Sequence, residues 1–141
     1  MKGSAWAYPL ANVTHLLGLT LLAGGIMAVD ARLLGAWKRL PLAALSDALT
    51  PLAVAGLVLF AVSGFAMFAS DAGPLIGSPV FLAKLAVIGL ALLNALAFRR
   101  YARGRLAGWD GGAPNPARAM AMASLVLWAT AIVLGRMMAY L

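Results

Sequence analysis

Residues Pro51–Ala69 read PLAVAGLVLFAVSGFAMFA, a run with no charged residue and one hydroxyl group, that of Ser63. An α-helix rises about 1.5 Å per residue, so about 20 apolar residues cross the hydrocarbon core of a bilayer. Three further apolar runs have a comparable length: Leu10–Val29, Pro79–Phe98 and Ala119–Ala139. The sequence therefore predicts an all-α fold, a single integral membrane four-helix bundle over residues 1–141, with helices at approximately 9–31, 50–70, 79–100 and 116–140.

The composition agrees with a membrane protein. Of the 141 residues, 64% are hydrophobic and 11% are charged, whereas soluble domains carry about 25% charged residues. The four helices use nearly the whole chain, so any ligand site must lie within the bundle or at its rims. The first apolar run is longer than the apolar core of a signal peptide, so we expect it to be retained as a membrane helix.

Several kinds of chemistry are excluded by residue usage. No Cys occurs, which excludes disulfides, thiolate metal ligands and cysteine nucleophiles. The acidic residues are four Asp and no Glu, and no phosphate-binding or metalloprotease motif is present, so we do not expect an enzyme. The net charge is +7, but the basic residues flank the apolar runs. This pattern is typical of topology signals and of contacts with anionic lipid headgroups, so we expect membrane lipid and no nucleic acid as a partner.

The basic residues also predict the orientation of the bundle. They lie in the first and third connections: Arg32, Lys38 and Arg39, and then Arg99, Arg100, Arg103, Arg105 and Arg118. The second connection, residues 70–78, carries Asp71 and no basic residue. Because basic loops stay in the cytoplasm, we expect both termini on the outer, periplasmic side of a bacterial inner membrane.

Proline follows an N-cap residue at three predicted helix starts: Thr50-Pro51, Ser78-Pro79 and Asn115-Pro116. Proline at the first helical position loses no hydrogen bond, and the residue before it can cap the first turn. Residues 41–49 are also helical in pattern, which leaves two interpretations of Pro51. Either helix two begins near Pro41 and kinks at Pro51, or a short interfacial helix, Pro41–Leu49, precedes helix two. We favour the short interfacial helix.

Three polar residues interrupt the apolar runs near the predicted outer face. His15 lies about 9 Å below the start of the first helix, and Lys84 lies about 7 Å below Pro79. Arg136 lies close to the outer end of the fourth helix. We therefore expect His15, Lys84 and Arg136 to share one layer as candidate ligand-binding residues. The alternative is that both cations, which lie within two turns of a helix end, extend to the membrane interface.

His15, the one histidine of the chain, carries most of the functional prediction. Its imidazole can donate an interhelical hydrogen bond, to Ser63 or Thr130 for example, or it can bind a ligand. With the soft sulfur atoms of Met67 and Met137 it could bind copper. One histidine cannot supply both axial ligands of a haem within one chain, but a His/Met pair or two copies of the chain could supply them. Copper and haem therefore stay open as candidate cofactors.

Other polar and small residues favour helix packing. Asp30 and Arg32 lie at one helix end and are expected to form an interfacial pair. Asn94 is expected to hydrogen-bond across a helix interface. Small residues recur at four-residue spacing in the first, third and fourth helices: Gly24 and Ala28, Ala91 and Ala95, and Ala131, Gly135 and Ala139. Such spacing allows close backbone contact, within the bundle or in a homodimer.

Six short runs carry a family resemblance: His15–Gly18, Gly24-Gly25, Asp30–Leu34, Phe81–Leu85, Leu93–Leu96 and Gly135–Tyr140. They resemble an uncharacterised bacterial family of four-helix membrane proteins over nearly the whole chain. That family is distantly similar to the membrane domain of copper-resistance protein D, which implies copper passage across the inner membrane with His15 as a ligand. The family tends to place His where this chain has Arg99, and that departure disfavours metal or haem binding.

Two hypotheses follow for the function. In the first, the bundle binds or passes a ligand in its outer half through His15, Lys84 and Arg136. The ligand would be a copper ion, a haem or quinone-like cofactor, or a small anion. In the second, the chain is a structural or accessory subunit that packs in a homo-oligomer or a larger membrane complex. The first is the interpretation we favour.

Overall fold

The computed structural model describes the backbone of residues 7–138 and the side chains of residues 9–69 and 76–137. Within the described residues all regular structure is helical: α1 (Ala7–Leu33), α2 (Leu42–Ile76), α3 (Pro79–Ala102), the 3₁₀ helix η1 (Leu106–Trp109) and α4 (Asn115–Met138). The four α-helices are each long and apolar enough to cross a membrane. The predicted all-α class and the predicted four membrane helices are therefore confirmed.

Helix α2 is longer at both ends than the sequence predicted. It begins at Leu42 and runs without interruption through Pro51 to Ile76. The separate interfacial helix that we favoured for residues 41–49 is thus the first part of α2. Beside the proline, the hydroxyl of Thr50 donates to the carbonyl oxygen of Ser46 at 2.6 Å. A helix can continue through a proline where side chains and neighbouring helices stabilise the interrupted turn.

Helix α3 begins as its sequence predicts. Ser78 lies in an extended conformation and its hydroxyl oxygen accepts from the Phe81 amide at 3.3 Å. Pro79 occupies the first helical position, where no amide hydrogen is needed. This cap fixes the point at which the chain enters α3 and thereby the level of Lys84 in the bundle.

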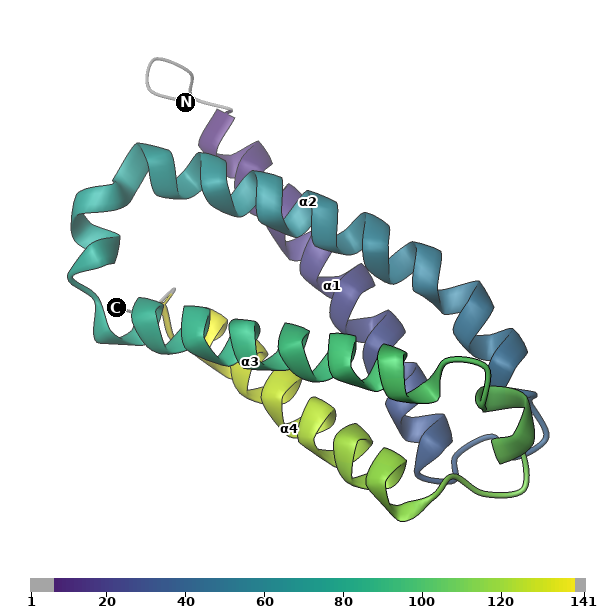
Figure 1. Cartoon of the computed structure of the whole chain (residues 1–141). Helices are drawn as coiled ribbons and strands as arrows, with labels where there is room; N and C mark the ends of the chain where they lie inside the picture. The colour runs from purple at the N-terminus through teal and green to yellow at the C-terminus, as the bar shows by residue number, and fades with distance from the viewer. Residues whose placement is uncertain (1–6, 139–141) are drawn as a thin grey trace.

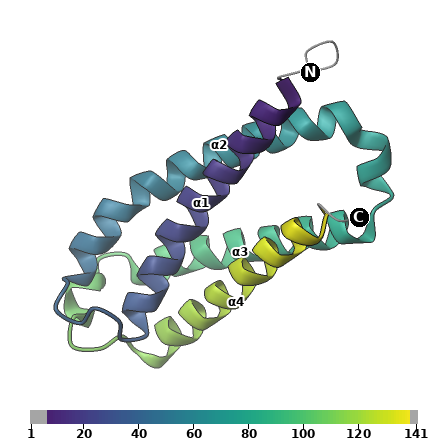
Figure 2. The ribbon, with the colours of Figure 1, turned by 180° about the vertical axis from the view of Figure 1, so that it is seen from behind.

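The four helices pack as two pairs. Helix α1 packs along α2, α3 packs along α4, and α1 joins the pairs through α4 (Figures 1 and 2). The backbones of α1 and α2 are in close contact where Gly18 of α1 lies against Gly56 of α2. A Cβ atom on Gly18 would lie 2.8 Å from the Gly56 carbonyl oxygen, and one on Gly56 would lie 2.6 Å from that of Gly18. In both views α2 and α3 diverge toward the end where they connect, which we call the α2–α3 end.

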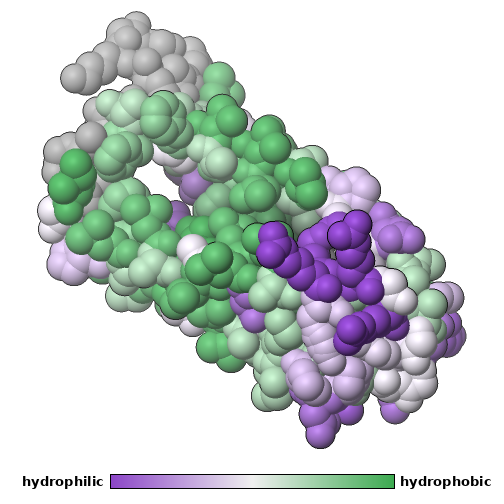
Figure 3. Space-filling view, viewed as in Figure 1, coloured by the Kyte–Doolittle hydropathy of each residue, from purple (hydrophilic) through white to green (hydrophobic). Residues whose placement is uncertain are grey.

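The interior is small and the outer surface is apolar. On α4 the buried residues recur at alternating spacings of four and three: Ala117, Ala121, Ser124, Trp128 and Ala131. Large apolar side chains cover the outside, including Phe65 at 73% exposed and Val62 at 65% exposed (Figure 3). An apolar covering of this extent fits a lipid surrounding and not water.

The opposite end, where the α1–α2 and α3–α4 connections meet, we call the basic end. Arg32 is only 3% exposed there and donates to the carbonyl oxygens of Leu40 at 2.9 Å, Asp110 at 3.2 Å and Lys38 at 3.4 Å. Its guanidinium also lies 4.0 Å from the Asp110 carboxylate. The Asp110 carboxylate accepts from the Leu42 amide at 2.9 Å, which caps the start of α2.

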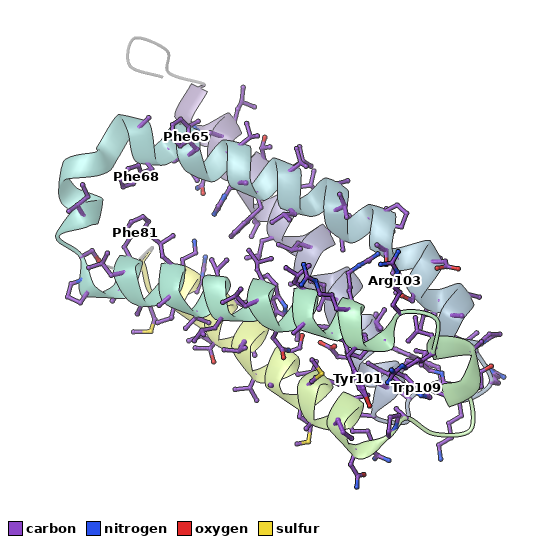
Figure 4. All side chains as sticks on the ribbon, in the orientation of Figure 1. Phe65, Phe68, Phe81, Tyr101, Arg103 and Trp109 are labelled. Carbon is purple, nitrogen blue, oxygen red and sulfur yellow. The ribbon has the colours of Figure 1, made fainter. Side chains whose placement is uncertain are left out.

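Aromatic side chains complete the basic end. Trp109 of η1 packs against Phe98 and against Tyr101 (Figure 4), with ring centroids 6.5 and 5.7 Å apart. Arg105 lies over the Tyr101 ring. The predicted interfacial pair of Asp30 with Arg32 does not form in this structure. Arg32 turns to the loop carbonyls and Asp110 because they offer it several acceptors in a buried position.

Candidate functional site

His15 lies on α1 against α2. Its Nδ1 lies 3.0 Å from the Phe60 carbonyl oxygen and 3.2 Å from the Ser63 hydroxyl oxygen. A carbonyl oxygen only accepts, so Nδ1 carries the hydrogen and donates. Ser63 donates its own hydroxyl hydrogen to the Leu59 carbonyl oxygen. The predicted hydrogen bond between His15 and Ser63 is confirmed, whereas Thr130 donates within its own helix to Val126.

This geometry fixes what the other ring nitrogen can do. With the hydrogen on Nδ1, the neutral imidazole keeps a lone pair on Nε2. Among the described residues Nε2 has no hydrogen-bond partner. A histidine held at one nitrogen by a backbone carbonyl presents the other nitrogen in a fixed orientation. His15 can therefore accept a hydrogen bond or bind a metal ion through Nε2.

Two residues of α2 hold the imidazole ring in place. The ring stacks on Phe60, with centroids 4.1 Å apart and planes inclined by 16°. On the next turn of α2, Gly64 leaves room for the ring edge, because a Cβ atom there would lie 3.0 Å from His15 Cε1. Sequence reasoning did not identify Phe60, although Phe60, Ser63 and Gly64 share one helical face by spacing.

Lys84 of α3 approaches the same Phe60 ring from the α3–α4 pair. Its Nζ atom lies 5.7 Å from the centroid of the Phe60 ring, within the range of a cation–π contact. The ammonium group also borders α4, because a Cβ atom on Gly135 would lie 3.6 Å from Nζ. In the part of the chain with described side chains, no carboxylate lies within 4.0 Å of it. His15 and Lys84 therefore meet at Phe60, as the prediction of a shared layer requires.

The remaining predicted site residues lie on α2 and α4. Arg136 is exposed in the last turn of α4, directly after Gly135. Met137 is 45% exposed, and Met67 is half-buried one turn beyond Ser63 on α2. No three His, Cys, Asp or Glu side chains among the described residues are grouped to hold a metal ion. A copper site of His15 with methionine sulfurs stays a prediction.

The surface is open beside this centre. Figure 3 shows an opening between α2 and α3 near the α2–α3 end, with hydrophilic residues visible inside it. The rings of Phe68 on α2 and Phe81 on α3 face each other beside it, with centroids 5.8 Å apart (Figure 4).

A second feature lies toward the basic end. Helices α1, α2, α3 and α4 line a partly open cavity of about 230 Å³, in which the polar residues Asp30, Asn94, Arg99 and Ser124 lie among apolar lining residues. Asn94 donates to the Met120 carbonyl oxygen of α4 at 2.9 Å, so its predicted interhelical hydrogen bond is confirmed.

No family model, no curated protein and no solved structure matches this chain. The resemblance to a bacterial four-helix family and to the copper-resistance protein D membrane domain therefore stays a prediction.

Proposed function

We propose that this chain is a small integral membrane protein that binds a quinone-like ligand at the α2–α3 end, between His15 and Lys84. Of the ligands that the sequence leaves open, a quinone-like ring suits these two side chains best. The observation that carries the proposal is their meeting on one aromatic ring. Both contact Phe60, one as a stacked imidazole and the other as an ammonium group.

The two polar groups are complementary to a quinol or quinone. The free lone pair of His15 Nε2 can accept from a ring hydroxyl, and the Lys84 ammonium group can donate to a ring oxygen. The ring itself is flat and apolar, and aromatic rings pack favourably against other aromatic rings. Phe60, Phe68 and Phe81 supply such surfaces at this end of the bundle.

The other candidate ligands fit less well. A copper ion would be repelled by the Lys84 ammonium group, which has no acidic partner among the described side chains. Haem with two histidine ligands is excluded within one chain, because His15 is its one histidine. A small anion would be attracted by the Lys84 ammonium group but repelled by the lone pair of His15 Nε2. The opening between α2 and α3 also favours a ligand that dissolves in lipid.

A second candidate function, packing as a subunit in a homo-oligomer or larger complex, is favoured by a different observation. A Cβ atom added to Gly24 or Gly89 would meet nothing within 4 Å. These glycines therefore do not serve close contacts inside the bundle. Small residues on an outer helix face suit contact with another membrane helix.

Equilibrium binding of a short-chain benzoquinone and its quinol to the purified chain in detergent tests the proposal. We expect His15→Ala and Lys84→Met each to weaken binding about tenfold, because each removes one hydrogen bond worth about 1–2 kcal/mol. Lys38→Met, which removes an exposed cation at the basic end, is the control and should bind as the wild type does. Equal binding by all four proteins would show that the benzoquinone only partitions into the detergent, and this result would overturn the proposal.

A further inference from the structure

The cavity near the basic end contains a carboxylate that forms no ion pair with any described side chain. Asp30 of α1 is 5% exposed and lines the cavity, and its Oδ2 atom has no hydrogen-bond partner. Buried carboxylates are normally paired, because removing a charge from water is costly. The nearest cation in sequence, Arg32, is occupied by loop carbonyls and Asp110. An unpartnered buried carboxylate in a cavity is a place for a ligand that donates hydrogen bonds.

A second unpartnered group lies on the facing helix. Ser124 of α4 is 2% exposed, lines the same cavity and borders the Asp30 carboxyl group. Among the described residues no hydrogen bond of good geometry reaches its hydroxyl oxygen, which interacts with the Asp30 carboxyl group alone. On α3, Asn94 donates through Nδ2 to Met120, which leaves its carbonyl oxygen free to accept. Three oxygen atoms from three helices can thus accept from one ligand.

The rest of the lining decides the kind of ligand. Leu22, Ile26, Leu57 and Leu92 give the cavity an apolar wall. Its volume of about 230 Å³ exceeds the roughly 150 Å³ of an engineered protein cavity that holds benzene. The one cation of the lining, Arg99, is exposed at the rim and donates to the Thr50 hydroxyl at 3.4 Å. The interior therefore offers acceptors and apolar surface, and its size fits one ring with a short substituent.

We propose that this cavity is a second ligand site, which binds a small organic ammonium compound with its amine against Asp30 and Ser124. The apolar body lies between α1, α2 and α3. A bare metal ion is a poorer occupant, because no cluster of three acidic or histidine side chains surrounds the cavity among the described residues. This site does not depend on the proposed quinone site, which lies at the opposite end of the bundle and uses other residues.

The test is calorimetric titration of the full-length chain in detergent with 2-phenylethylammonium. We expect saturable binding that Asp30→Asn weakens about tenfold or more through loss of the charge. The matched control is Asp47→Asn, which removes an exposed carboxylate of α2 and should leave binding unchanged. The neutral analogue 2-phenylethanol should bind about tenfold more weakly than the ammonium compound.

A cavity-filling variant covers the case in which Asp30→Asn does not fold. Ala95→Phe fills the cavity from α3 and keeps the carboxylate, whereas Ala97→Phe adds the same ring on an exposed face of α3. We expect Ala95→Phe to abolish binding and Ala97→Phe to retain it. The proposal is overturned if the wild type shows no saturable binding, if Ala95→Phe binds as well as Ala97→Phe, or if 2-phenylethanol binds as tightly as the ammonium compound.

Discussion

The imidazole of His15 and the ring of Phe60 stack with centroids 4.1 Å apart, while the Phe60 carbonyl oxygen accepts from the same imidazole at 3.0 Å. Phe60 of α2 therefore contacts the face of the imidazole through its own ring and the edge of the imidazole through its carbonyl oxygen. This double contact selects the hydrogen position on Nδ1 and leaves Nε2 for a ligand. Lys84 lies over the same aromatic ring from the other helix pair.

Gly64 should be essential for the position of His15. In Gly64→Val the new side chain would collide with the imidazole, because even a Cβ atom lies 3.0 Å from Cε1. We expect the ring to move and quinone binding to weaken about tenfold, which corresponds to about 1.4 kcal/mol. Equilibrium binding measures this, with Gly89→Val as the control, since a Cβ atom at Gly89 meets nothing within 4 Å. Unaltered binding by Gly64→Val would contradict the placement of the site.

The contact of Gly18 with Gly56 should control the stability of the bundle. A methyl group on Gly56 would lie 2.5 Å from the Leu22 amide nitrogen, so Gly56→Ala must push α1 away from α2. We expect it to lower the free energy of unfolding by about 1–3 kcal/mol, the usual cost of overpacking. Gly24→Ala should be nearly neutral, because its Cβ atom would meet nothing within 4 Å. Denaturant titration in detergent compares the two, and equal stabilities would argue against the close crossing.

At the basic end, Asp110 should stabilise the chain through both of its contacts. Asp110→Ala removes the acceptor for the Leu42 amide and the carboxylate beside Arg32. We expect a loss of about 1–2 kcal/mol, comparable to the loss of a helix cap. Asp47→Ala removes an exposed carboxylate instead and serves as the control. If thermal unfolding in detergent gave the same midpoint for both variants, Asp110 would not cap α2.

The orientation can be tested because the chain has no cysteine. The positive-inside rule predicts that the α2–α3 connection faces outward and the α1–α2 connection faces the cytoplasm. A membrane-impermeant maleimide applied to intact cells should therefore label Gly77→Cys and not Lys38→Cys. The reverse pattern would place the His15 and Lys84 layer on the cytoplasmic side.

Hydropathy and capping residues predict much of the architecture. The four apolar runs correspond to the four long helices, and the cap at Ser78 lies where its sequence indicates. These features depend on residues close together in the chain. The continuity of α2 through Pro51 was the alternative interpretation and not the favoured one, because a proline after a threonine is equally typical of a helix start and of a tolerated helix interior.

The site could be predicted only in part. Depth along each helix is sufficient to bring His15 and Lys84 into one layer, but it does not indicate which side chain both of them contact. Phe60 is separated from His15 by 45 positions, and Arg32 is separated from Asp110 by 78. Contacts at such distances depend on how the helices rotate and cross, and in a membrane that depends on the fit of small residues more than on hydrophobicity.

The most direct measurement is the identity of what the chain retains when it is purified from membranes in mild detergent. Organic extracts, metal content and visible absorption should be recorded for the wild type, His15→Ala and the control Lys38→Met. We predict a quinone in the wild type and in Lys38→Met that is lost from His15→Ala, with neither copper nor a haem band. Copper or haem that depends on His15, or a quinone content unchanged by His15→Ala, would contradict the proposed function.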